Sequence, residues 1–530
     1  MRRTPFRLAT AAAVVALLAA GCSSGGGSAD GDEPDASSFS FAIGEPDFLT
    51  PGRQGVAFEV VTSIFSPLVE LTEDGELTYL AAESVESEDS TTWTVTLRDG
   101  WTFHDGTPVT AQSYVDAWNT VAYAPNGWAW SGSFANVVGY EDVAPAEGEP
   151  TAETMSGLRV VDDSTFEVEL RGPDSQFPLQ LTAGATAFYP MPESAYEDLD
   201  AYDEQPIGNG PFRLTEPWAP NEPIVVEAYE DYAGDEPGVE RIQFTQYTDL
   251  GTAYTDVQAG TTDIVFVEAS RIAQVEQDFG DRVHAYEAPG QSFLGFPLDD
   301  PRYADPRIRQ AISLAIDRDA INEAIYGGFN TPLTALTAEV LPGSPTEICD
   351  FCEFDPERGK ELLAEAGGWE GTMEVWYPGG LGADDLFTAV ANQIRQNLEI
   401  DDVVPTPTTD WAAWYEALTT GQVAGPHFAR WGALYPSMQD PLRALFTEAG
   451  GCQPCTTYSS PDVDALLAQA DAASEPAESE ALYAQAQERI LEDFPVVPMF
   501  SESYVYAFSE KIADAKASSG SLRLPTVTVS

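Results

Sequence analysis

Apolar and polar residues alternate in three short segments of the chain. Phe39, Phe41 and Ile43 are separated by single small residues, and the same spacing of two recurs in residues 93–98 and 166–170. A spacing of two places every second side chain on the same face of an extended chain. Each segment is therefore predicted to be a half-buried β-strand.

Apolar residues three or four positions apart predict helices between these strands. The first such series runs through Val56, Val60, Ile64 and Leu68. Trp411, Trp414 and Leu418 have helical spacing as well and are expected to be core residues. Further helices are expected to begin after residues whose side chains can cap a helix N-terminus, namely Thr110, Asp305, Asp355 and Ser460. Because helices and strands are mixed in irregular order, the pattern predicts an α/β or α+β body.

The first residues of the chain have the pattern of a leader. Three arginines precede an apolar run over residues 8–20, which is too short to span a bilayer as a helix. The sequence Ala19-Ala-Gly-Cys22 follows and resembles a bacterial lipobox, although Ala19 stands where a leucine is more usual. The resemblance implies that residues 1–21 are a signal peptide and that Cys22 is acylated. An ordinary secretory cleavage is the alternative.

The segment after the leader is unusually simple in composition. Residues 22–38 consist almost entirely of Ser, Gly, Asp, Ala and Pro. Such a composition cannot bury a core and is typical of a flexible linker. No later run approaches the roughly 18 apolar residues of a membrane helix. The sequence therefore predicts an extracytoplasmic body that a lipid anchor tethers to the cell membrane.

The chain is strongly acidic, with 87 Asp and Glu against 24 Lys and Arg and a formal net charge of −63. This charge argues against nucleic acid and anionic membrane surfaces as ligands. Its simplest interpretation is a solvated acidic coat, and attraction of cationic ligands is the alternative. Since 43% of the 530 residues are hydrophobic and the body is too long for one core, two or three domains are expected.

The body contains two Cys-x-x-Cys pairs, Cys349 with Cys352 and Cys452 with Cys455. Two such pairs are compatible with a four-thiolate zinc site. However, a long stretch of chain separates them, and an exported body meets an oxidising environment, which favours disulfides. Whether the bridges form within or between the pairs stays open, and no metal site is expected.

We find no pattern of catalytic residues in the sequence. No nucleophile elbow lies between a predicted strand and helix, and no phosphate-binding or dinucleotide-binding motif occurs. The histidines, His104, His284 and His427, are too widely separated to indicate a metal site or a general base. We therefore expect a binding protein that is not an enzyme and needs no cofactor. An exported hydrolase with unrecognised chemistry is an alternative.

One block of residues makes this expectation specific. The stretch from Trp93 to Thr110 resembles the signature of the peptide/nickel solute-binding proteins of ABC importers, family 5. Stretches similar to further motifs of that family follow in the same order, at residues 163–170, 206–212, 257–264, 307–318, 354–357, 362–367, 458–464 and 495–500. The resemblance covers about residues 39–510.

The resemblance implies an α/β fold of the bilobal, type II periplasmic-binding-protein class, with hinge strands between the lobes. Lobe I would take residues 39–80, 205–288 and 493–530, an extra small domain 81–204, and lobe II 289–492. The implied function is that of a monomer which captures a peptide or related polar solute between closing lobes and delivers it to a membrane permease. A sensory or chaperone-like binding lipoprotein without a dedicated permease is the alternative.

The segment Arg430-Trp431-Gly432-Ala433-Leu434-Tyr435 is expected to contact the ligand, because it resembles the family's Gly-Trp-x-Ala-Asp-Tyr stretch. In the family, the aspartate of that stretch pairs with the free α-amino group of a peptide. Leu434 stands at this position, and an isobutyl group cannot balance a buried ammonium. We therefore expect a ligand without a free α-amine; the alternative is that another carboxylate takes over.

Further candidate ligand contacts rest on less specific patterns. Trp128 and Trp130 lie in a loop rich in Gly and Pro, where aromatic side chains often form a ligand platform. Packing of that loop on its own domain is the alternative. By similarity to the family, the remaining candidates are Arg53, Gln54 and Gly55 near the rim of lobe I, and Phe293 and Gly295 on a strand that lines the cleft.

Overall fold

The computed structural model describes residues 37–530 except 73–74, 183–186, 381, 449 and 451. The predicted signal peptide, Cys22 and nearly all of the predicted linker lie outside the described residues, so these assignments stay predictions. In the described chain, helices and strands are mixed in irregular order, which confirms the α/β prediction. Among the described residues, no helix is both long and apolar enough to cross a membrane.

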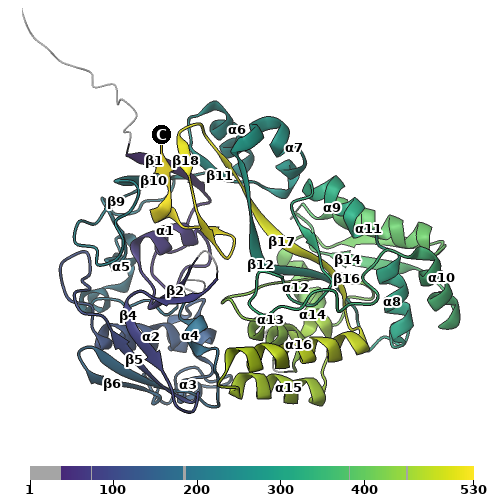
Figure 1. The fold of residues 1–530 in the computed structure, drawn as a ribbon, viewed down its shortest axis with the longest axis horizontal. Helices are drawn as coiled ribbons and strands as arrows, with labels where there is room; N and C mark the ends of the chain where they lie inside the picture. The colour runs from purple at the N-terminus through teal and green to yellow at the C-terminus, as the bar shows by residue number, and fades with distance from the viewer. Residues whose placement is uncertain (1–36, 73–74, 183–186, 381, 449, 451) are drawn as a thin grey trace, which may run out of the picture. The chain divides into compact units, whose positions relative to one another are not determined.

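One large sheet runs through the body (Figure 1). Its strands lie in the order β15 (Val403–Pro407), β14 (Met373–Tyr377), β16 (His427–Gly432), β12 (Val283–Gly295), β17 (Val497–Phe508), β11 (Ile264–Phe266), β1 (Ser38–Ile43), β10 (Arg241–Gln246), β9 (Ile224–Ala228) and β8 (Phe212–Leu214). The short strand β13 (Thr331–Pro332) also pairs with β17. The first predicted strand is β1, and its residues Phe39, Phe41 and Ile43 are buried, as the spacing of two requires.

The strands β12 and β17 are the longest of this sheet and pair with each other in antiparallel register. Val283 lies opposite Ala507 at one end of the pair, and Leu294 lies opposite Val497 at the other. Tyr506 packs in a first hydrophobic core, whereas Leu294 and Val497 pack in a second. The strand pair therefore passes from one core to the other.

The first core gathers side chains from residues 39–244, from 264 and from 506–527, and the second gathers residues 293–500. A smaller cluster packs α6 (Leu250–Ala259) and α7 (Ala269–Phe279) against β1 and β11. The expected boundaries of two lobes and a small domain stay predictions.

A separate sheet packs in the first core, with the strand order β4 (Ala82–Glu86), β5 (Thr92–Leu97), β7 (Thr165–Glu169) and β6 (Leu158–Asp162). Helix α2 (Ala111–Ala122) covers it, with the ring of Trp118 5.3 Å from that of Phe166. The hydroxyl of Thr110 accepts the N–H of Ser113 and caps this helix. The predicted strands in 93–98 and 166–170 and the predicted cap are thus confirmed.

The other predicted helix starts are confirmed at α8 (Pro306–Leu314), α10 (Pro356–Glu365) and α15 (Pro461–Ala472). The carboxylates of Asp305 and Asp355 accept backbone N–H groups in the first turns of α8 and α10. The remaining longer helices are α9 (Arg318–Tyr326), α11 (Asp384–Asn397), α12 (Trp411–Thr419), α13 (Gln439–Phe446) and α16 (Pro476–Asp493), and shorter ones are α3 (Tyr140–Val143), α4 (Phe177–Gln180), α5 (Leu199–Glu204) and α14 (Gln453–Thr456).

Two expectations about helices are wrong in detail. The series from Val56 predicted a longer helix, but α1 spans Phe58–Ile64 because Ala57 adopts a left-handed conformation, with φ of 57°. Val56 is consequently 48% exposed. The spacing of Trp411, Trp414 and Leu418 predicted a buried face of α12. Trp414 and Leu418 are buried, but Trp411, at the first position of the helix, is 50% exposed.

Candidate functional site

Pairing between β16 and β12 brings several of the predicted site residues together. Arg430, Trp431 and Gly432 lie on β16, opposite Ser292, Gln291 and Gly290 of β12. Phe293 and Gly295 follow on β12. This group of candidates therefore occupies two neighbouring strands, although the pairing joins positions up to 142 residues apart, as in Gly290 and Gly432.

The loop after β16, residues 433–436, is held by hydrogen bonds on two sides. On one side, the N–H of Ala433 donates to the carbonyl of Pro289 at 2.7 Å. On the other, Asp440 in the first turn of α13 accepts the indole N–H of Trp431 at 2.7 Å and the backbone N–H of Leu434 at 2.9 Å, both on Oδ2. Hydrogen bonds within the protein therefore fix the geometry of the loop.

Asp440 is 9% exposed. Burial raises the pKa of its carboxyl group to about 6, although the hydrogen bonds from Trp431 and Leu434 oppose the shift. Arg443, one turn further along α13, pairs with Asp471. Asp440 thus acts as an acceptor that orients the loop.

Two buried amides also hold this region. Gln291 donates from Nε2 to the carbonyl of Trp431 at 3.0 Å and accepts the N–H of Ala338 at 3.2 Å. Gln439 accepts the hydroxyl of Tyr435 at 2.7 Å. Burial raises the pKa of Tyr435 well above its ordinary value, so its hydroxyl stays protonated and remains a donor. Sequence reasoning missed Gln291, Gln439 and Asp440, because single amides and carboxylates in an acidic chain carry no signal.

Arg430 makes a bidentate ion pair with Glu502 of β17, with Nε 2.7 Å from Oε1 and Nη2 2.5 Å from Oε2. The pair crosses over β12, since β12 lies between β16 and β17. Such a fork-to-carboxylate contact is specific in geometry. The pair engages Nε and Nη2, which carry only part of the five N–H donors of the guanidinium.

The candidates of the first core form a second group. Arg53 lies over the ring of Phe48, 4.1 Å from its centroid, and contacts Asp200 at 3.3 Å. The indole N–H of Trp130 donates to the carbonyl of Gln54 at 2.8 Å. The N–H of Gly55 donates to the carboxylate of Asp47. Trp128 is buried in the first core, which agrees with packing on its own domain, and its role as a ligand contact stays a prediction.

The structure places the sulfurs of each Cys-x-x-Cys pair side by side, with Cα atoms 5.5 Å apart for Cys349 and Cys352 and 5.3 Å apart for Cys452 and Cys455. The backbone of the second pair packs directly on β12. A Cβ added to Gly295 would lie 2.3 Å from the carbonyl oxygen of Cys455, so this position accepts only glycine. Packing alone therefore accounts for Gly295.

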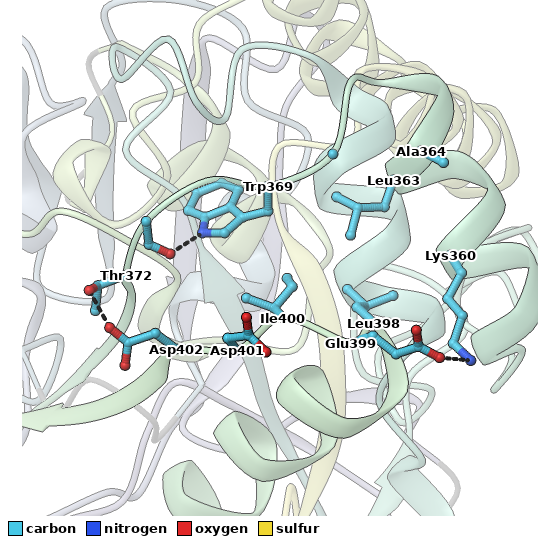
Figure 2. Close-up of a pocket in the computed structure, with 12 residues that line it drawn as sticks. Lys360, Leu363, Ala364, Trp369, Thr372, Leu398, Glu399, Ile400, Asp401 and Asp402 are labelled. Carbon is cyan, nitrogen blue, oxygen red and sulfur yellow. Dashed lines mark hydrogen bonds and ion pairs between the residues drawn. The ribbon is translucent and has the colours of Figure 1, made fainter.

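A pocket of about 590 Å³ lies elsewhere, at the surface beside the second core (Figure 2). Leu363, Leu398 and Ile400 form part of its wall, and Lys360 bonds to Glu399 across its edge at 3.1 Å. None of the sequence-predicted site residues lines it. Among the described residues, no group of His, Cys, Asp or Glu side chains is arranged to hold a metal ion.

Two curated proteins of Escherichia coli are similar in sequence to most of this chain. The periplasmic murein peptide-binding protein MppA of Escherichia coli (strain K12) is 26% identical over 484 residues, which is 88% of this chain and 86% of MppA. The periplasmic oligopeptide-binding protein OppA of the same organism is 26% identical over 456 residues, 82% of this chain and 81% of OppA.

Solved structures give the same fold. The unliganded open form of MppA matches with a TM-score of 0.80 and 24% identity over 93% of this chain and 97% of that one. Haemophilus influenzae OppA in complex with RPPGFSPFR matches with a TM-score of 0.71 and 21% identity over 93% of this chain and 99% of that one. The expected bilobal α/β fold is thereby confirmed. Since the model of the bacterial extracellular solute-binding proteins, family 5 (middle region), matches residues 76–452, the chain belongs to this family.

Proposed function

We propose that the protein is the substrate-binding component of an ABC importer, which captures a peptide or related polar solute between two closing lobes and delivers it to a membrane permease. The observation that carries the proposal is the strand pair β12–β17, whose ends lie in two different cores of a chain from a solute-binding family. Small dihedral changes in such strands can move one core relative to the other without disrupting either. Similar proteins are named for peptide binding. On this proposal the protein needs no cofactor and catalyses no reaction.

The proposed ligand has no free α-amino group. Leu434 cannot accept a hydrogen bond from an ammonium, and Oδ2 of the nearby Asp440 is directed at the N–H groups of Trp431 and Leu434. A buried ammonium without a carboxylate partner is costly. A blocked or cyclic peptide, a sugar or another polar metabolite avoids this cost.

Calorimetry and thermal shifts with matched peptides test the proposal. We expect N-acetylated tri- to pentapeptides to bind, and to raise the melting temperature more than the same peptides with a free amine. The Leu434→Asp variant should gain affinity for the free-amine peptides by roughly tenfold or more, because a charge-assisted bond becomes possible. Leu434→Asn, which adds a polar group of the same shape without the charge, is the matched control.

The two parts of the proposal have different failure modes. Tight binding of free-amine peptides by the unaltered protein would refute the assignment of the ligand class and leave the transport function intact. The binding of no peptide, together with the absence of any co-purified solute, would refute the function itself.

We also propose that Cys22 carries the lipid anchor and that each Cys-x-x-Cys pair is a disulfide. The Cα separations of both pairs lie within the range of disulfides, which supports the second part. Mass spectrometry of membrane-bound protein should find a diacylated N-terminal Cys22, and the Cys22→Ala variant should carry no acyl chains. Thiol labelling of the unfolded protein should detect no free cysteine among the four until a reductant is added. An unmodified Cys22 in the membrane-bound protein, or labelling without reductant, would contradict these assignments.

A further inference from the structure

A polar contact joins elements of the two cores at a place distant in sequence from β12 and β17. The segment 174–180, which ends in α4, belongs to the first core through Phe177. It meets α13, α15 and α16, which pack in the second core, and Figure 1 shows α4 beside α16. We call this region the inter-core contact.

Gln439, at the start of α13, lies at the centre of the inter-core contact and is 2% exposed. Its Nε2 donates to Oδ1 of Asp174 and to Oδ1 of Asp471, at 2.9 Å in each case. Its Oε1 accepts the hydroxyl of Tyr435 at 2.7 Å and the amide of Gln180 at 3.4 Å. The side-chain amide therefore uses both of its donors and its acceptor, which a carboxylate or an apolar group could not do.

Other hydrogen bonds surround Gln439 in the inter-core contact. The backbone N–H of Ser175 donates to the carbonyl of Asp471 at 2.8 Å. The side chain of Gln176 accepts the hydroxyl of Ser437 at 2.8 Å and donates to the hydroxyl of Ser479 at 3.3 Å. A contact made of hydrogen bonds exchanges them for bonds with water when it opens, so it separates more readily than an apolar contact of equal size.

The same turn of α13 also holds the candidate ligand loop. Asp440, the residue after Gln439, orients Trp431 and Leu434, and Gln439 itself holds Tyr435. Neighbouring residues of one helical turn are thus bonded to the loop and to the other core. A displacement of this turn must move both together.

We propose that Gln439 is a positioning residue that couples the geometry of the 431–435 loop to the inter-core contact, so that ligand affinity depends on Asp174 and Asp471, which are not in the loop. The proposal rests on the proposed function, because it takes this loop to be part of the ligand site. The coupling between the loop and the inter-core contact does not require a ligand, so it is tested in the ligand-free protein.

Hydrogen–deuterium exchange of the purified, ligand-free protein is the test. The Gln439→Glu variant keeps the acceptor for Tyr435 but removes both donors and places a third carboxylate beside Asp174 and Asp471. We expect exchange to become roughly five- to thirtyfold faster in segments 174–181 and 431–438 and to stay unchanged in α11. Gln485→Glu, at an exposed position of α16, is the matched control and should change neither segment.

Tyr435→Phe is the second variant, because it removes one hydroxyl from the loop and leaves the fold intact. We expect faster exchange in segment 174–181 as well as in the loop, since the hydroxyl holds Gln439. The double variant Gln439→Glu with Asp174→Asn should recover part of the protection, because the amide introduced at position 174 can donate to the carboxylate introduced at position 439. The proposal would be overturned if, in both Gln439→Glu and Tyr435→Phe, exchange became faster only in the segment that contains the substitution. A failure of the proposed function would instead appear as an absence of ligand binding in the unaltered protein, with the coupling of exchange rates preserved.

Discussion

The buried carboxyl group of Asp440 makes a quantitative expectation possible. Replacing it by asparagine keeps an oxygen where Oδ2 accepts the N–H groups of Trp431 and Leu434, but removes the ionisation. Burial raises the pKa of Asp440 from 3.8 to about 6. Each tenfold change in acidity corresponds to about 1.4 kcal/mol, so ionisation in the folded state costs about 3 kcal/mol more than in the unfolded chain.

The direction of the pH dependence follows from the same shift. Between pH 4 and 6 the unfolded chain releases this proton while the folded protein retains it, so the contribution of Asp440 to stability falls as the pH rises. Above pH 6 both states are ionised and the loss is complete. We therefore expect Asp440→Asn to be more stable than the unaltered protein by about 1 kcal/mol at pH 4.5 and about 3 kcal/mol at pH 7.5.

Urea unfolding at both pH values, followed by fluorescence and circular dichroism together, measures this difference. The other carboxylates contribute equally to both proteins, so the difference between them isolates Asp440. Gln396→Ala, at an exposed position of α11 that carries no ionisable group, is the control and should show a difference that does not vary with pH. If the advantage of Asp440→Asn stays constant or shrinks as the pH rises, the account of a desolvated carboxyl group that orients the loop is refuted.

Two further predictions concern motifs that the family resemblance singled out. Arg318 is 3% exposed and donates to the carbonyls of Pro498 and Cys352 at 2.7 and 3.0 Å. The Arg318→Met variant should therefore have a free energy of unfolding that is lower by about 3 kcal/mol or more. The control Arg395→Met, at an exposed position, should change it by less than about 0.5 kcal/mol. A Cβ at Gly208 would lie 1.8 Å from the carbonyl oxygen of Ile64, so Gly208→Ala should cost about 2 kcal/mol or more in the same assay. A cost below about 0.5 kcal/mol in either case would contradict the packing described for that motif.

Local patterns predicted those parts of the fold that depend on residues close in sequence. The spacing of two identified β1, β5 and β7, and the caps at Thr110, Asp305 and Asp355 marked the starts of α2, α8 and α10. The same reasoning misjudged the start of α1, because the left-handed conformation of Ala57 is set by the surrounding loop and not by residue type.

The candidate site could be predicted as a segment but not as an arrangement. The motif at 430–435 pointed to β16 and its loop, yet its pairing with β12 joins residues 140 positions apart and has no local signal. Asp440 and Gln439 could not be identified, because their roles arise from burial and from partners in other elements. In a chain with 87 acidic residues, one more carboxylate is not distinctive.

The central claim is that the two cores enclose a small molecule and leave its covalent structure unchanged. Native mass spectrometry of the purified protein, followed by denaturation and analysis of whatever is released, tests this claim most directly. The account predicts a complex heavier than the polypeptide by one small solute, which is recovered with the same mass after release and rebinds unchanged. A protein that never carries or rebinds a solute, or a solute that returns chemically altered, would contradict it.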